Sequence, residues 1–158
     1  MNAAGLLGAL AQGEVRFVVV GGIAAVLQGA PVATFDVDVV HDRSPENVRR
    51  LVRVLEGLEA SYVRAAGAAR IEPREELLLG EGHHLLTTRL GRLDVLGRIE
   101  EGRGYDELLP GTVEVPVGPV LVRVLSLARL LEVKRVSARP KDRAIVAVLE
   151  AVLRRGAR

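Results

Sequence analysis

The chain has 158 residues, enough to bury a hydrophobic core in one domain and too few for two ordinary domains joined by a linker. Apolar residues make up 49% and charged residues 27%, a composition that excludes an intrinsically disordered chain. Cysteine is absent, so disulfides, thiolate nucleophiles and cysteine-based zinc sites are excluded. Any metal ion must therefore be held by oxygen or histidine.

The net charge of +2 is unevenly distributed along the chain. Residues 1–118 hold 12 arginines against 17 acids, whereas residues 119–158 hold 10 basic residues against 3 acids. A basic C-terminal region suits an anionic partner such as a triphosphate or RNA, and equally a solvated arginine-rich helical surface. No stretch reaches the roughly 18 apolar residues of a membrane span, so we expect a cytoplasmic protein without a membrane partner.

The first part of the chain predicts alternating strands and helices. Gly21-Gly22 separates an apolar strand from a short helix, and Ser44-Pro45 provides the N-cap and first residue of an amphipathic helix. The expected elements are a weak helix over 3–12, a strand over 16–20, a helix over 23–27, a strand over 34–40 and a helix over 45–58.

The second part is less regular and ends in two helices. The expected elements are short strands at 62–64 and 70–71, a helix or strand at 75–79, strands over 84–90 and 92–96, a loop at 105–109, extended segments over 113–117 and 120–125, and helices over 127–136 and 141–154. This order predicts an α+β (α/β-like) fold: a mixed sheet flanked by helices, with a C-terminal helical pair. We expect one domain over 1–158, with its core at about 14–118 and a helical segment at about 126–156.

Two carboxylates share one face of the strand expected over 34–40. Because side chains alternate along a strand, Asp36 and Asp38 point the same way as Thr34, and the residues between them point the other way. Like charges side by side in a half-buried sheet need a raised pKa, an arginine partner or a divalent cation. Oxygen ligands favour Mg²⁺, and Asp94, in the strand over 92–96, could complete the cluster.

The pair Gly21-Gly22 has two interpretations. Glycines between a strand and a helix allow the backbone and the helix N-terminus to approach a phosphate. A simple tight turn would use the same pair.

These features together resemble a known family. The Gly-Gly turn, the Thr34-x-Asp36-x-Asp38 strand and the third aspartate are similar to the nucleotidyltransferase superfamily to which polymerase beta belongs, and within it to the AbiEii-type and MenT-type toxin nucleotidyltransferases. The segment LARLLEVKRVSARPKDRAIVAVLEAVL resembles that group's helical segment, with a lysine followed by Arg-Pro-Lys-Asp. The resemblance covers most of the chain and leaves residues 60–82 unmatched.

The resemblance implies site residues and a cofactor. Asp36, Asp38 and Asp94 would be catalytic and would ligate Mg²⁺ or Mn²⁺, and Asp94 would also orient or deprotonate the attacking hydroxyl. Three carboxylates suffice for such a site, since the metal ions activate the nucleophile and stabilise the phosphates. The nucleotide-binding residues implied are Gly21, Gly22, Thr34 and Lys134.

Lys134 lies on the apolar face of its predicted helix, three and four residues after Leu131 and Leu130. A lysine there needs a partner. It would contact the nucleotide phosphates, form a salt bridge with Asp142, or extend its ammonium group into solvent. Asp142 itself is expected to be structural, because it falls in the first turn of a helix, where the dipole stabilises an acid.

The three histidines are expected to be structural. His83 and His84 are adjacent on a strand, so they point apart, and no third ligand lies at a suitable spacing. His41 follows the aspartate strand on the opposite face.

Two functions remain open at the level of the sequence. The first is a Mg²⁺-dependent nucleotidyltransferase that moves an NMP from an NTP to a hydroxyl of RNA, such as tRNA, or of a protein. The second is a non-catalytic protein of the same fold that binds nucleotide, RNA or a partner chain, for instance a cognate antitoxin or helical partner in a toxin–antitoxin pair. The carboxylates favour the first. Ile23 and Val32 favour the second, because relatives often carry a hydroxyl residue and an arginine there.

Overall fold

The computed structural model describes residues 1–99, 102–137 and 140–156, and these include a mixed sheet of seven strands in the order β3-β4-β5-β2-β1-β7-β6. The β2–β5 and β1–β7 pairs are parallel and the other pairs are antiparallel. The strands are β1 (Phe17–Val20), β2 (Asp36–His41), β3 (Ser61–Tyr62), β4 (His83–Thr88), β5 (Gly91–Leu96), β6 (Thr112–Val117) and β7 (Val120–Leu125). The predicted α+β class with a mixed sheet is confirmed.

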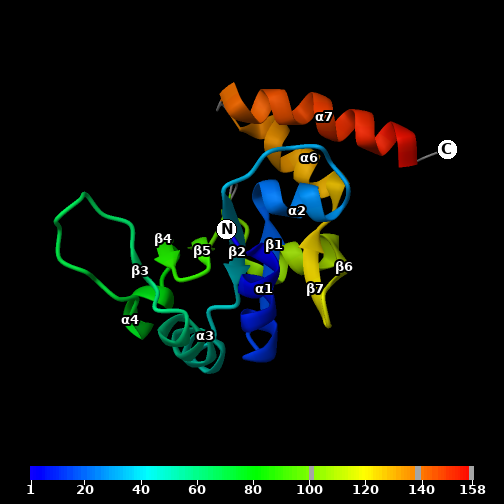
Figure 1. Ribbon diagram of the computed structural model, residues 1–158. Coiled ribbons are helices and arrows are strands. Elements are labelled where there is room, and N and C mark those ends of the chain that lie inside the picture. Colours follow the sequence, from blue (N-terminus) through cyan, green and yellow to red (C-terminus); the bar gives the residue numbers. More distant parts are fainter. Residues whose placement is uncertain (100–101, 138–139, 157–158) are drawn as a thin grey trace.

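The helices lie around this sheet. They are α1 (Ala3–Gln12), α2 (Gly21–Leu27), α3 (Pro45–Gly57), α4 (Glu75–Leu78), α5 (Tyr105–Leu108), α6 (Leu127–Val136) and α7 (Pro140–Gly156), with a 3₁₀ turn, η2 (Leu109–Gly111). Figure 1 shows α6 and α7 together at one end of the molecule, next to α2, with α3 and α4 toward the other end. Within the described ranges, no helix is long and apolar enough to cross a bilayer.

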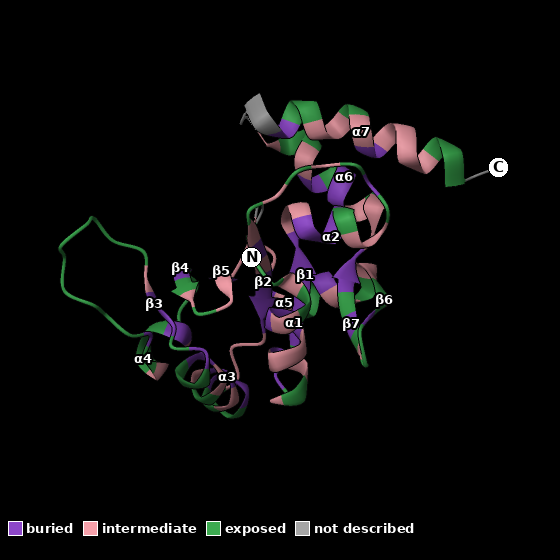
Figure 2. Cartoon of the chain, viewed as in Figure 1, coloured by how far each residue is buried: buried purple, intermediate pink, exposed green. Residues whose placement is uncertain are grey.

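The core lies along the central strands. All four residues of β1 are buried, and Val37 and Val39 of β2 are fully buried on one face of the sheet (Figure 2). Helix α3 buries Leu51 and Leu55, one turn apart, and thus covers the core with one face. The polar side chains at alternate positions of β2 therefore leave the sheet on the face opposite to Val37 and Val39.

The strand that carries Asp94 lies next to the strand that carries Asp36 and Asp38, as the expected cluster requires. β2 and β5 are parallel neighbours, and their register pairs Asp38 with Asp94. The strands expected over 84–90 and 92–96 also form an antiparallel hairpin, although β4 ends at Thr88 and the turn is Arg89-Leu90.

The start of the aspartate strand differs from the prediction. β2 begins at Asp36 rather than at 34, so Thr34 and Phe35 belong to the preceding connection. Phe35 is 82% exposed and does not join Val37 and Val39 in the core. Alternation within a strand says nothing about residues that precede its first ladder hydrogen bond, which explains the error.

The segments at 105–109, 62–64 and 70–71 also differ, whereas the segment at 75–79 takes one of its two expected forms. The loop expected at 105–109 is a short helix followed by η2. Of the segments at 62–64 and 70–71, only Ser61–Tyr62 forms a strand, although the Tyr62 amide donates to the Ile71 carbonyl over 2.9 Å. The ambiguous segment at 75–79 is helical over Glu75–Leu78.

Candidate functional site

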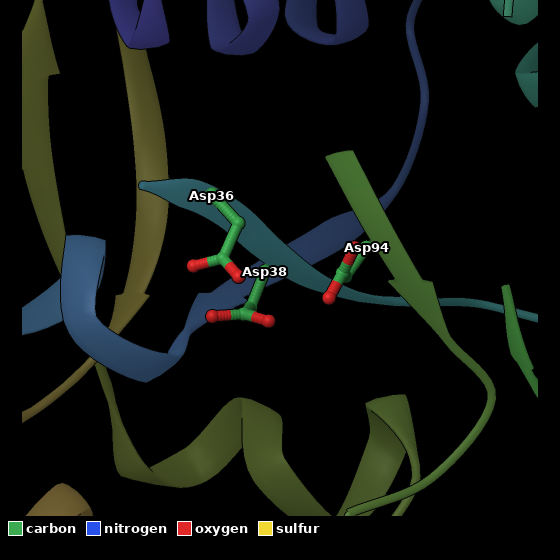
Figure 3. Close-up of side chains that lie close together, drawn as sticks. All are labelled: Asp36, Asp38 and Asp94. Carbon is green, nitrogen blue, oxygen red and sulfur yellow. The ribbon is translucent and has the colours of Figure 1, made fainter. Parts of the chain in front are cut away.

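Three carboxylates converge on one face of the sheet. Asp36 and Asp38 are two residues apart on β2, and the register with β5 sets Asp94 beside Asp38. Each residue offers a carboxylate oxygen, and these oxygens all lie within 4.8 Å of one another. Figure 3 shows the three side chains directed to the same space from the two neighbouring strands. Asp94 is buried, and the other two are half-buried.

The glycine turn lies directly against this cluster. Val20, the last residue of β1, pairs with Asp38 across the antiparallel ladder, so the chain must turn into α2 beside that carboxylate. Gly21 makes this turn with a φ of 69°, in the left-handed region that favours glycine. A Cβ at Gly21 would lie 2.0 Å from Asp38 Oδ2. Gly21 is therefore required by both backbone geometry and space, which a simple tight turn would not explain.

Gly21→Ala is expected to displace Asp38 and weaken metal-dependent nucleotide binding, whereas Gly29→Ala is not. Gly29 has a similar φ of 86°, but a methyl group added there would have nothing within 4 Å. Both substitutions should cost about 1–3 kcal/mol of backbone strain. Thermal melts of the two variants measure the cost of backbone strain, and nucleotide titrations measure the effect of displacing Asp38. Equal nucleotide affinities would show that the close approach of Gly21 to Asp38 has no role in the site.

The Thr34 side chain supports the acid cluster. Its hydroxyl lies 3.1 Å from the Asp36 backbone carbonyl and 3.2 Å from Asp36 Oδ1, and it donates to these oxygens. A Cβ at Gly22 would lie 2.9 Å from Thr34 Oγ1, so the absence of a side chain at Gly22 makes room for the hydroxyl. Thr34 thus orients Asp36, an interaction that strand alternation alone did not predict.

The carboxylates and the glycine turn line a cavity of about 870 Å³. The cavity also receives Lys134, so it includes all the residues expected to bind nucleotide or metal. An apolar part of its lining comes from β7, α6 and α7, through Leu125, Leu130, Val133 and Ile145. Another part comes from β4 and the segment after β5, through His83, Leu85, Arg98 and Ile99.

This second part of the lining was not identified from the sequence. Leu85 pairs with Asp94 across the β4–β5 ladder, which places it beside the carboxylates. This pairing follows from the two-residue turn Arg89-Leu90, which lies just before Gly91. Arg98 follows the strand and forms an ion pair with Glu81 at 2.5 Å, and its place in the cavity had no local sequence pattern to indicate it.

Lys134 forms the salt bridge that was one of its expected alternatives. Its Nζ donates to Asp142 Oδ1 over 2.7 Å, and the Ser137 hydroxyl donates to Asp142 Oδ2 over 2.5 Å. The Asp142 side chain is fully buried and the Lys134 side chain is 13% exposed. Since Lys134 also lines the cavity, the salt bridge and a phosphate contact are compatible. Arg139, the first residue of the Arg-Pro-Lys-Asp stretch, lies outside the described residues.

The histidines take no part in the acid cluster. Burial lowers the pKa of His41 and of His84, which favours their neutral forms. His41 is fully buried, with its ring nitrogens 3.1 Å and 2.7 Å from the carbonyls of Leu96 and Leu78, and so joins β5 to α4. His84 Nδ1 lies 2.8 Å from the Tyr62 hydroxyl. The aspartates form the one candidate metal-binding group found among the described residues.

The donor set fits a hard divalent cation. All three ligands are carboxylate oxygens, the type that Mg²⁺ and Mn²⁺ prefer, and opposite ligands of one Mg²⁺ lie about 4.2 Å apart. The observed separations, within 4.8 Å, require only a small side-chain adjustment. Bringing three carboxylates this close is unfavourable without a positive charge, so the arrangement itself favours cation binding.

Three solved structures share this fold. A Thermotoga maritima protein provisionally named a nucleotidyltransferase superimposes with a TM-score of 0.54 and 21% identity, over 81% of this chain and 77% of that one. ANT(2")-Ia in complex with adenylyl-2"-tobramycin superimposes with a TM-score of 0.56 and 16% identity, over 94% of this chain and 85% of that one. The solution structure of the same antibiotic-resistance factor superimposes with a TM-score of 0.55 and 16% identity, over 94% of this chain and 80% of that one. No protein-family model and no curated protein matches the chain. The chain thus has the nucleotidyltransferase fold.

Proposed function

We propose that this protein is a divalent-metal-dependent nucleotidyltransferase that transfers an NMP from an NTP to a hydroxyl group. The observation that carries the proposal is the convergence of Asp36, Asp38 and Asp94 in one cavity with the Gly21-Gly22 turn. This combination provides metal ligands and a close backbone approach for phosphate within one space. The likeness to nucleotidyltransferase structures supports the same reaction.

The nucleotide would bind at the glycine turn. The first turn of α2 has no side-chain cap, which leaves backbone N–H groups at Gly21 and Gly22 for the phosphates. Lys134 would add a positive charge to the same space, and Thr34 would hold Asp36 in its ligating orientation. The apolar lining from β7, α6 and α7 suits the remainder of the nucleotide.

The acids would hold the metal and activate the acceptor. Asp36 and Asp38 would ligate Mg²⁺ or Mn²⁺, which supplies charge stabilisation for the phosphates and the leaving pyrophosphate. Asp94 would orient the acceptor hydroxyl and accept its proton at a carboxylate oxygen. The acceptor oxygen then bonds to the α-phosphorus while the bond to the β-phosphate bridging oxygen breaks. The products are the nucleotidylated acceptor and pyrophosphate.

The acceptor and the biological role extend this proposal. ANT(2")-Ia was solved with adenylyl-2"-tobramycin, so that protein accommodates a nucleotidylated small molecule. For this chain the resemblance to AbiEii-type and MenT-type enzymes supports a hydroxyl of RNA, such as tRNA, or of a protein. The same resemblance supports a role as a component of a toxin–antitoxin pair, with a cognate antitoxin or helical partner.

A second candidate function is nucleotide or RNA binding without catalysis. Ile23 and Val32 stand where relatives often have a hydroxyl residue and an arginine, and Lys134 is already paired with Asp142. Each of these features would weaken triphosphate binding relative to an active enzyme.

The two functions differ in one measurable product. We expect that incubation with each labelled NTP, Mg²⁺ and total RNA or cell protein yields a labelled acceptor and pyrophosphate, and that chelation of the metal stops both. Nucleotide binding without any pyrophosphate release, across all four NTPs and both acceptor pools, would contradict the enzymatic proposal and leave the binding function.

A further inference from the structure

A second cavity, of about 470 Å³, lies beside the acid cluster and is lined by three arginines. Arg64 and Arg70 belong to the connection between β3 and α4, which Figure 2 shows as a long exposed segment. Arg92 belongs to β5, the strand that carries Asp94. Among the described residues, no aspartate or glutamate lines this cavity.

The sheet places this cavity and the acids on one face. Arg92 and Asp94 are two residues apart on β5, so their side chains leave the strand on the same side. Arg92 pairs with Thr87 of β4 on one flank and with Asp36 of β2 on the other. Ser61 of β3 continues the row beyond Thr87. Since neighbouring strands are about 4.8 Å apart, the row runs from the acids into the second cavity without a gap.

The arginines retain most of their capacity to bind an anion. Within the parts of the chain that the structure describes, the side chain of Arg92 forms no ion pair and donates no hydrogen bond. Arg64 donates to the Ala69 carbonyl over 2.9 Å and has no carboxylate partner in the same ranges. Arg70 donates to the Glu59 carbonyl and lies 3.6 Å from Glu72, an exposed pair of little strength. Three guanidinium groups around one cavity thus lack a buried counter-charge among the described residues.

We propose that the cavity lined by Arg64, Arg70 and Arg92 binds phosphate groups of a polynucleotide acceptor whose terminal hydroxyl reaches Asp94. This inference rests on the proposed function, and it assigns both a binding site and an acceptor class. Guanidinium groups match phosphate oxygens in bidentate geometry. The Ser61–Thr87–Arg92 row leads from this cavity to Asp36 along one face of the sheet, and the bound strand would follow it to the carboxylates.

The size and charge of the cavity favour a polynucleotide over other acceptors. A cationic small molecule would be repelled by three arginines. A neutral protein hydroxyl carries no charge for the three arginines to bind. A phosphate chain would use several at once, and its repeating charge would occupy the row between the two cavities.

The test measures acceptor binding without nucleotide or metal. Fluorescence anisotropy of a short labelled single-stranded RNA, titrated with the protein at several salt concentrations, gives affinity and salt dependence. The variants are Arg92→Ala, the pair Arg64→Ala with Arg70→Ala, and all three together. Arg53→Ala is the matched control, because Arg53 is an exposed arginine on α3 that lines neither cavity. Thermal melts establish that each variant is folded.

We expect the triple variant to bind RNA at least about tenfold more weakly, and the salt slope to fall by about 0.7 for each phosphate that the variant no longer neutralises. Arg53→Ala should bind as the wild type does. Unchanged affinity and slope in the triple variant, or no RNA binding by the wild type at low salt, would overturn the proposal. Arginine-dependent binding of an acidic peptide without binding of RNA would overturn it in favour of a protein acceptor.

Failure of this inference is distinguishable from failure of the proposed function. Nucleotide affinity with Mg²⁺, measured on the Arg64→Ala, Arg70→Ala pair, should be unchanged because neither arginine lines the larger cavity or belongs to a strand that carries an aspartate. If the wild-type protein binds RNA through the arginines but binds no nucleotide, the proposed nucleotidyltransferase activity is contradicted and the proposed phosphate-binding cavity is supported.

Discussion

Asp38→Asn is expected to lower nucleotidyl transfer by at least about a thousandfold, since electrostatic stabilisation of this kind is typically the largest catalytic contribution. Asp38 is central to the site: it pairs with Asp94 in the parallel ladder, and its Oδ2 lies against Gly21. The asparagine keeps the shape of the side chain and removes the charge. Labelled-nucleotide transfer and melting curves with and without Mg²⁺ provide the measurement, because the metal-induced rise in melting temperature should also disappear.

One control accompanies this variant. Asp106→Asn removes an exposed aspartate of α5, which lines neither cavity, and should leave transfer and metal response unchanged.

Asp36→Asn combined with Asp38→Asn should raise the melting temperature of the metal-free protein, because repulsion between like charges is removed. A marked loss of stability in this double variant would instead identify the two acids as structural.

The acid cluster could be predicted because its geometry is local. Two aspartates at spacing 2 on a strand must share a face, and the apolar residues between them identify that face as the one turned away from the core. The third member needed only the adjacency of β2 and β5, which the sequence pattern suggested. Its register, Asp38 with Asp94, became known only from the structure, since a shift by one residue would turn Asp94 to the opposite face.

Other features depended on tertiary geometry that no local pattern indicates. Phe35 was expected to point the same way as Val37 because it continues the alternation of β2, yet the ladder begins one residue later and its side chain is exposed. Arg64 and Arg70 belong to a segment, residues 60–82, in which neither periodicity nor resemblance gave a firm prediction. Their place beside Arg92 in one cavity depends on the path of that connection, which no local pattern indicates.

The Lys134–Asp142 pair illustrates how burial changes an expectation. From the sequence, substitution of Lys134 would have little effect on folding if its task were to contact phosphates. The structure places its ammonium group 2.7 Å from a carboxylate of a fully buried side chain. Removing one partner of a buried pair leaves the other charge poorly compensated, so a large effect on stability is now expected.

Lys134→Met should therefore lower the free energy of unfolding by about 3 kcal/mol, at the lower end for a broken buried pair because the Ser137 hydroxyl still donates to Asp142. Asp142→Asn breaks the same salt bridge but keeps the ammonium group. The double variant should recover much of the stability, since no buried charge is left uncompensated. Urea denaturation of the four proteins completes a double-mutant cycle, and a coupling energy near zero would contradict the buried salt bridge.

Nucleotide titration of the same proteins decides whether Lys134 also acts in the site. If its ammonium group meets the phosphates, Lys134→Met should weaken NTP binding by about 1.5–3 kcal/mol, the range for a hydrogen bond to a charged group. Asp142→Asn should retain NTP affinity or improve it, because the ammonium group is released from its carboxylate while still lining the cavity. Equal NTP affinities in both variants, alongside the reduced stability, would assign Lys134 to the joining of α6 and α7 alone and leave phosphate binding to the Gly21-Gly22 turn and the metal ligands.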